Sequence, residues 1–258
     1  MSWRSRRQGT YFTIFGIIIV ILLSVILYPI FIKPATCTDL KQNGNETGID
    51  CGGTCAMYCP KTIALPRVDF TAVFPVSDEV YNAVALLTST ATGAGSRSAG
   101  YTFTLYDPSG KIINESKGTT FIPSASQFAV FYPQIRTGQR IATRARFTWE
   151  EAPINFEKIK LDSNSLPLEE SSWKRETVLD MERINVDITN NSFVNIPESE
   201  YIVIVYDEND EPIASSKTTA ILPAHSSQTL YFSWPYVFTQ TPKRYELIKR
   251  VNPFTYAK

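Results

Sequence analysis

The pattern of apolar and polar positions divides this chain of 258 residues into three regions. Residues 11–32 form an unbroken apolar run without a charge, and residues 33–61 are polar and rich in turn-forming residues. From residue 62 onward, short runs alternate between apolar and polar side chains with a period of two, and turn residues separate the runs. This pattern predicts one long helix, a polar connector and a body of β-strands.

The run 11–32 has the length and composition of a transmembrane helix. As a helix it would measure about 33 Å, enough to cross a hydrocarbon core of about 30 Å. Arg4, Arg6 and Arg7 precede it, and no acidic residue does. Because basic residues favour the cytoplasmic side, we expect residues 1–10 to form a cytoplasmic tail and the rest to lie outside the membrane. Membrane lipid is therefore the first predicted partner.

Three other uses of an N-terminal apolar run fit less well. A cleaved signal peptide has a shorter apolar core of about 7–15 residues and a small-x-small cleavage site, for which "YPIFIKPATC" is a poor match. A lipoprotein would use Cys37 but would have leucine three positions earlier, and a pilin-like helix would carry a glutamate near its start. The sequence favours an uncleaved anchor, with the signal peptide as the alternative.

All four cysteines, Cys37, Cys51, Cys55 and Cys59, lie in the segment 33–61 just beyond the apolar run. An extracytoplasmic segment lies in an oxidising environment, where disulfides persist. Two disulfides are expected, and four cysteines allow three connectivities, among which the spacing does not decide. A short polar segment cannot build a hydrophobic core, so the cross-links would hold it together.

Metal binding by this segment has weaker support. Zinc sites usually pair cysteines at C-x2-C spacing in a reducing compartment, and neither condition holds here. Calcium prefers oxygen ligands, and the segment offers five residues with such oxygens in an order unlike that of an EF-hand: Asp39, Asn43, Asn45, Glu46 and Asp50. We predict no metal or cofactor site and leave calcium open for this segment.

The segment also resembles a short module of secreted and surface-anchored proteins, written C…NGxETGxDCGGxCxxC. Here the module corresponds to Cys37, residues 43–55 and Cys59, with the last gap one residue longer. The resemblance covers about a tenth of the chain and implies an extracytoplasmic spacer without activity.

The β-rich body repeats itself at an offset of one hundred residues. "YTFTLYDPSGKIINESKGTTFIPSAS" begins at Tyr101, and "YIVIVYDENDEPIASSKTTAILPAHS" begins at Tyr201. The two strings align without a gap, and apolar positions face apolar positions. The same offset, carried upstream, aligns Val84 and Leu86 with Ile184 and Val186. We infer two copies of one domain.

Each copy has the size and pattern of an immunoglobulin-like domain. Several short strands separated by turns predict an antiparallel β-sandwich. The expected fold class is all-β, with two tandem sandwiches at residues 62–165 and 166–258 behind the transmembrane helix. The polar stretch 161–172 is the candidate hinge between them.

The string "FTLYD", residues 103–107, resembles the FxLYD-type domain, a small β-sandwich of bacterial cell-envelope proteins. The second copy reads "VIVYD" at residues 203–207. The resemblance covers most of residues 80–135 and 180–235. It implies a sandwich fold and an envelope location, in the manner of uncharacterised bacterial surface proteins, and it carries no catalytic residue to this chain.

Catalytic motifs are missing from the sequence. The one histidine, His225, is expected on a surface loop, which argues against histidine-dependent triads and multi-histidine metal sites. Asp107 and Asp207 precede turns, where an aspartate accepts hydrogen bonds from backbone amides. Basic and acidic residues balance at 25 each, so nucleic acid is not an expected partner. Outside the apolar run and its tail, 22 basic residues face 25 acidic ones.

Four arginines form the one surface feature that suggests binding. In "RTGQRIATRARFTW" every arginine falls on an even position, Arg136, Arg140, Arg144 and Arg146. A single strand would place them on one face. Such a row is ordinarily a solvated face or an edge charged against aggregation. Its functional interpretation is an anion-binding stripe for a wall polymer, a lipid head group or an acidic protein.

The sequence therefore predicts a non-catalytic, single-pass protein of the cell envelope whose sandwiches bind an envelope protein or wall polymer, or act as a spacer. A subunit of a secretion or pilus-type assembly is the first alternative. An enzyme with carboxylates brought together only by the fold is the second.

Overall fold

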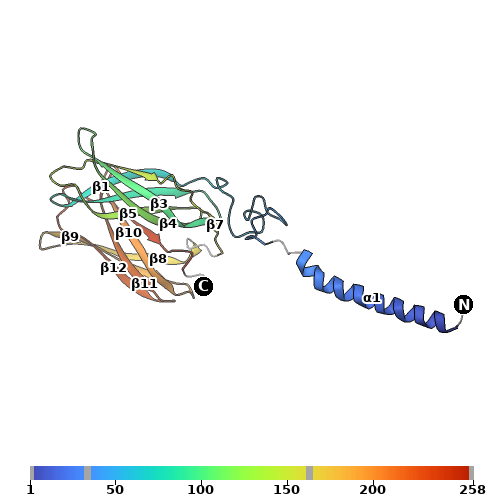
Figure 1. The fold of residues 1–258 in the computed structure, drawn as a ribbon. Helices are drawn as coiled ribbons and strands as arrows, with labels where there is room; N and C mark the ends of the chain where they lie inside the picture. The colour runs from blue at the N-terminus through green and yellow to red at the C-terminus, as the bar shows by residue number, and fades with distance from the viewer. Residues whose placement is uncertain (1–2, 32–35, 161–164, 256–258) are drawn as a thin grey trace. The chain divides into compact units, whose positions relative to one another are not determined.

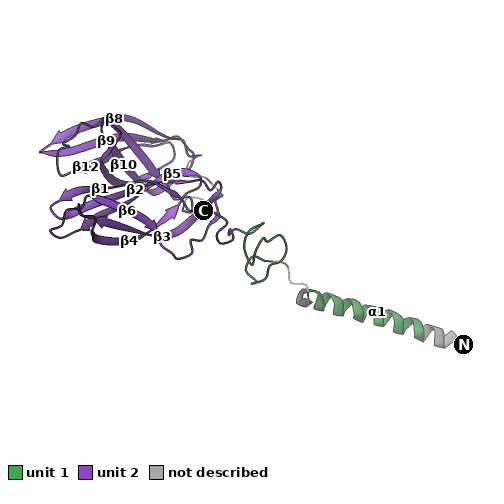
Figure 2. Ribbon diagram, turned by 90° about the horizontal axis from the view of Figure 1, so that it is seen from above, with its two compact units in different colours: residues 1–55 green, residues 56–258 purple. Residues whose placement is uncertain are grey.

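The computed structural model describes residues 3–31, 36–160 and 165–255. Beyond one N-terminal helix the protein is built of antiparallel β-sheets, which confirms the predicted fold class. The chain divides into two compact units, residues 1–55 and residues 56–258 (Figure 2).

The helix α1 spans Trp3–Phe31 and so begins inside the predicted cytoplasmic tail (Figure 1). Its apolar stretch Gly9–Tyr28 has a mean hydropathy of 2.7 and is long and apolar enough to cross a membrane. Every large apolar side chain from Tyr11 to Tyr28 is exposed. A helix that is apolar on all sides and packed against nothing suits a lipid environment. The same features occur in a signal sequence.

The first six long strands of the unit 56–258 form two facing sheets. Their bounds are β1 Arg67–Ser77, β2 Val80–Ser89, β3 Ala94–Tyr106, β4 Ile112–Ile122, β5 Ser126–Arg136 and β6 Arg144–Trp149. One sheet has the order β1-β2-β5, the other β4-β3-β6, and the short β7, Glu157–Lys158, pairs with β3. Phe103, Leu105 and Phe128 lie in the core between the two sheets.

The last six strands repeat this arrangement. They are β8 Leu168–Val178, β9 Met181–Asn190, β10 Ile196–Tyr206, β11 Pro212–Leu222, β12 Ser227–Trp234 and β13 Arg244–Arg250. The sheets β12-β9-β8 and β11-β10-β13 enclose a second core with Tyr201, Val203 and Phe232. The predicted hinge does not match: residues 161–164 lie outside the described residues, and Leu168–Ser172 belong to β8.

The offset between the halves is not constant along the chain. Strands β4 and β11 begin one hundred residues apart, but β2 and β9 begin 101 residues apart, because the first copy has one residue more between the end of β2 and Ser96 than the second copy has between the end of β9 and Ile196. The predicted upstream alignment was therefore wrong. Ile184 lies in the second core, whereas Val84 points out of the first sandwich. A slip of one residue moves every side chain of a strand to the other face.

The two sandwiches pack against each other through a third apolar cluster, which we call the inter-sandwich interface. Phe74, Val84, Leu86 and Ala129 come from the sheet β1-β2-β5, and Ile202, Ile204, Tyr206 and Ile248 come from β11-β10-β13. All eight are at most 8% exposed. The ring of Phe70 meets the ring of Tyr206 edge-on, with centroids 6.4 Å apart. In Figure 2 the two sandwiches lie side by side in one unit.

Candidate functional site

The cysteine segment is cross-linked as predicted. Cys37 and Cys55 form one disulfide with a Cα–Cα distance of 5.7 Å, and Cys51 and Cys59 are also disulfide-bonded. Cys55 is 1% exposed and Cys51 8%. Buried, disulfide-bonded cysteines thus take the place of an apolar core in this segment.

The acidic side chains of this segment bind its own backbone. The carboxylate of Asp50 accepts hydrogen bonds from the N–H groups of Asp39 and Leu40, at 3.0 and 2.9 Å. The side-chain amide of Asn43 donates to Asp39 at 2.7 Å and lowers the pKa of that carboxyl. Glu46 accepts from the N–H of Asn43 at 3.3 Å. The carboxylates of Asp39, Glu46 and Asp50 thus already act as acceptors within the loop, whereas Oδ1 of Asn43 is buried without a hydrogen-bond partner among the described residues.

The two turn aspartates have the predicted role. Oδ1 of Asp107 accepts hydrogen bonds from the N–H groups of Ser109 and Lys111, both at 2.9 Å. Oδ1 of Asp207 accepts from the N–H groups two and four residues later, at 2.8 and 2.9 Å. The pKa of Asp107 is lowered first by the hydrogen bond from the Ser109 hydroxyl and then by that from the Lys111 N–H, and the pKa of Asp207 is lowered chiefly by the hydrogen bond from the Glu211 N–H. Both aspartates therefore stabilise turns.

His225 lies in a corner with a φ of 54°. Its ring meets the ring of Phe193 edge-on at 4.5 Å, and Phe193 is 90% exposed. The backbone N–H of His225 donates to the carbonyl of Ser192 at 3.3 Å. The histidine is thus part of a surface corner, in agreement with the sequence.

The four arginines do not share one strand. The predicted strand begins only at Arg144, so Arg140 lies in the preceding loop, and Arg136 ends β5 in the opposite sheet. Arg144 and Arg146 do lie on one face of β6 and are both exposed. The guanidinium of Arg144 stacks on the ring of Tyr106 at 4.7 Å. The loop 137–143 connects β5 in one sheet to β6 in the other. The four arginines are therefore spread over two sheets and the loop between them.

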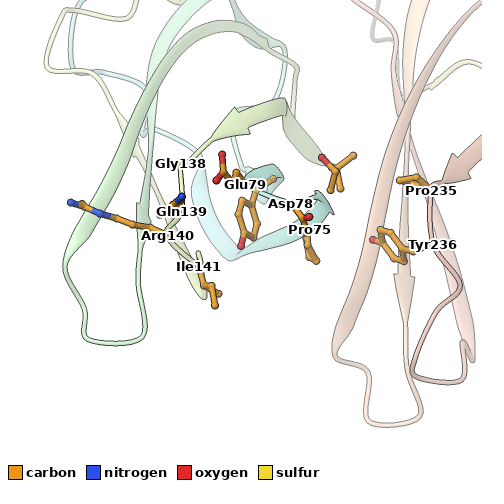
Figure 3. A pocket seen from close by; sticks show the side chains of 12 residues that line it. Pro75, Asp78, Glu79, Gly138, Gln139, Arg140, Ile141, Pro235 and Tyr236 are labelled. Atoms are coloured by element: carbon orange, nitrogen blue, oxygen red, sulfur yellow. The ribbon is translucent and has the colours of Figure 1, made fainter.

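A groove with a volume of about 550 Å³ lies at one end of the two sandwiches (Figure 3). Three segments line it. They are the β1–β2 hairpin with Asp78 and Glu79, the loop Gly138–Ile141, and Pro235 with Tyr236 just after β12. The N–H of Thr137 donates to the carbonyl of Glu79 at 2.9 Å and holds the first two segments together.

The residues that line this groove do not place two carboxylates on opposite sides of it. Burial raises the pKa of Tyr236 to about 12, so its hydroxyl remains protonated at neutral pH. Figure 3 shows the guanidinium of Arg140 pointing away from Pro235 and Tyr236. Asp78 and Glu79 are neighbours in one turn and belong to one side of the groove. A carboxylate pair for glycoside hydrolysis would instead flank the scissile bond from two sides.

Two features of the second sandwich were missed from the sequence. The first is the inter-sandwich interface, for which a signal was present. Ile202 and Ile204 are apolar at outward positions of β10, where the first copy has Thr102 and Thr104. Apolar side chains on both faces of a strand indicate that both faces are buried.

The second is a buried ion pair. Glu182 is fully buried, and its carboxylate accepts two hydrogen bonds from the guanidinium of Arg175, at 2.7 and 3.1 Å. Arg175 and Glu182 lie on neighbouring antiparallel strands, so only the β8–β9 pairing reveals their contact.

Comparisons with known proteins add little to this picture. No protein-family model matches the chain, and no curated protein sequence matches it. Among solved structures, a β-glucuronidase of glycoside hydrolase family 2 aligns over 87% of this chain with 10% identity and a TM-score of 0.23. The chain spans 28% of that enzyme's length.

Proposed function

We propose that this protein is a single-pass, membrane-anchored protein of a bacterial cell envelope, and that its two packed sandwiches form a non-catalytic binding or spacing module outside the membrane. The resemblance of residues 103–107 to the FxLYD-type domain agrees with this location. The observation that carries the proposal is the apolar helix, whose side chains are exposed from Tyr11 to Tyr28.

The energetic argument concerns the helix in water. Leaving a Leu, Ile, Val or Phe side chain exposed costs about 1.5–3 kcal/mol relative to burial. The stretch Gly9–Tyr28 contains more than ten such side chains, and 0% of it is buried within the protein. Insertion into lipid removes this cost. The disulfides add the second half of the argument, because they persist in an oxidising compartment.

The body of the protein supports binding or spacing. The inter-sandwich interface joins the two cores into one unit, so the pair presents a surface with a fixed spacing between its ends. The groove at one end combines apolar and charged side chains from both sandwiches. Recognition by loops on a rigid β-scaffold is common in such folds.

The test is the fate of the full chain in a bacterial membrane. We expect the intact protein to stay with the membrane after alkaline carbonate extraction. Its four cysteines should react with a maleimide only after reduction, and protease added outside the cytoplasmic membrane should reach the body. A soluble product shortened at its N-terminus would identify the run as a cleaved signal and refute the anchor.

A matched pair of variants separates anchoring from folding. Ile18→Arg places a charge in the middle of the span, where an arginine costs about 2.5–3.5 kcal/mol, and should weaken membrane retention. Ile141→Arg introduces the same side chain at a loop position that is 66% exposed and should leave retention unchanged. Equal retention of both variants would contradict a transmembrane role for the helix.

A further inference from the structure

A second, smaller cleft lies where the two sandwiches meet, on the side of β4 and β13. Its volume is about 260 Å³. Six residues from both sandwiches line it: Arg97, Thr119, Thr120, Phe121, Glu200 and Arg250. At about 30 Å³ per water molecule, the cleft has room for several waters or one small anion.

Arg250 is the unusual member of this cleft. It comes from β13 and is 3% exposed. Its Nη2 donates to the hydroxyl of Thr120 at 2.5 Å and to the carbonyl of Phe121 at 3.2 Å. Its Nε and Nη1 have no hydrogen-bond partner among the described residues. A buried donor without a partner is costly, most of all on a charged group.

Aromatic rings hold this guanidinium in place. Its carbon lies 4.1 Å from the ring centroid of Phe121 and 5.2 Å from that of Phe128. Burial lowers the pKa of Arg250 to about 10, which leaves the side chain charged at neutral pH. The carboxylate of Glu200 is 3.7 Å from Nε, beyond hydrogen-bonding distance. The charge is thus fixed at the cleft, and two of its nitrogens, Nε and Nη1, have no hydrogen-bond partner among the described residues.

The named charges around the cleft do not cancel. Lys217 binds Glu200 at 2.6 Å, and Arg97 binds Glu157 at 2.5 Å. With Arg250, three cations face two carboxylates. One positive charge is left over, and it sits in a place largely shielded from water. A bound monoanion would balance it and accept the open N–H groups.

We propose that the cleft between β4 and β13 binds a phosphate-type oxyanion through Arg250 and Arg97. Arg250 brings N–H groups without a partner to the cleft, and Arg97, whose guanidinium also binds Glu157, brings a second guanidinium. Guanidinium forks match tetrahedral oxyanions well. Free phosphate and a phosphate ester share this chemistry. The site does not depend on the membrane location proposed above.

Isothermal titration of the full chain in detergent micelles with inorganic phosphate tests the site, with chloride at equal ionic strength as the reference. We expect saturable binding. Arg97→Gln should weaken it by about tenfold or more, since a charged hydrogen bond is lost. Arg97 has a side chain that is 60% exposed, so the variant should fold. A second titration uses glycerol 1-phosphate. If it binds more tightly than inorganic phosphate, the site is assigned to phosphate esters, and if it binds more weakly, the site is assigned to free phosphate.

The control is Arg67→Gln, which removes the same charge from an exposed side chain that binds Asp69 and does not line the cleft. It should bind phosphate like the unmodified chain. Side-chain nitrogen spectra provide a readout specific to Arg250, whose Nε–H signal should shift on titration. An absence of saturable binding, or equal weakening by the two substitutions, would overturn the proposal and leave water as the partner of Arg250.

Discussion

The inter-sandwich interface gives the sharpest test of the packing described here, through the substitution Ile204→Thr. Ile204 is fully buried between the two sandwiches, next to Val84 and Leu86. The first copy has Thr104 at the matching position, so a β-strand accepts threonine there. The substitution therefore perturbs the interface without disturbing the strand.

The magnitude has two parts. Burial of an isoleucine side chain is worth about 1.5–3 kcal/mol, of which threonine keeps the part that belongs to its methyl group. The new hydroxyl enters an apolar cluster, and an unpaired buried hydroxyl costs about 1–3 kcal/mol. We expect the free energy of unfolding to fall by about 2–4 kcal/mol.

Urea unfolding of the full chain in detergent measures this change, and hydrogen exchange followed by mass spectrometry locates it. Amides of β2 and β10 should exchange faster, because those strands form the two sides of the interface. Ile221→Thr is the control, since Ile221 is 59% exposed on β11. A loss below about 0.5 kcal/mol, or equal losses in both variants, would refute the view that the cluster holds the sandwiches together.

Two further predictions concern buried and local charges. Arg175→Gln should lower the free energy of unfolding by about 3 kcal/mol, because it leaves the carboxylate of Glu182 buried without its cation. Lys117→Gln removes an exposed ion pair and should lower the free energy of unfolding by less than about 1 kcal/mol. Asp207→Ala should lower the urea midpoint near pH 7, by an amount that shrinks as the pH is lowered below 3.8. The reason is that the pKa of Asp207 lies below its ordinary value of 3.8, so its stabilisation is complete above that value and is lost as the pH falls through the lowered pKa.

Each of these has a contrary outcome. Equal losses for Arg175→Gln and Lys117→Gln in urea unfolding would show that burial of Glu182 adds nothing to its ion pair. A deficit of Asp207→Ala that does not shrink at any pH below 3.8 would show that the aspartate stabilises the fold by packing and not through its charge.

Local features of the structure could be predicted because their causes lie within a few residues. The alternation in residues 101–105 decides the strand β3, and the turn residues after Asp107 decide the hairpin to β4. The alignment upstream of residue 96 could not be predicted, because one extra residue between β2 and Ser96 changes which residues of the two copies correspond, while Val84 and Ile184 are both apolar. The groove and the phosphate cleft were also out of reach, since each combines segments from both sandwiches.

The sequence by itself determined the apolar helix, the disulfide-linked segment and the all-β body, because composition and periodicity act over short stretches of chain. It also held the contrast between Ile202 and Thr102, which in hindsight marks the covered face. Only the tertiary structure decided which sheet of one sandwich meets which sheet of the other. It also decided that the guanidinium of Arg250 lies in the cleft between them. Those outcomes depend on contacts between residues more than a hundred positions apart, whose pairing no local pattern specifies.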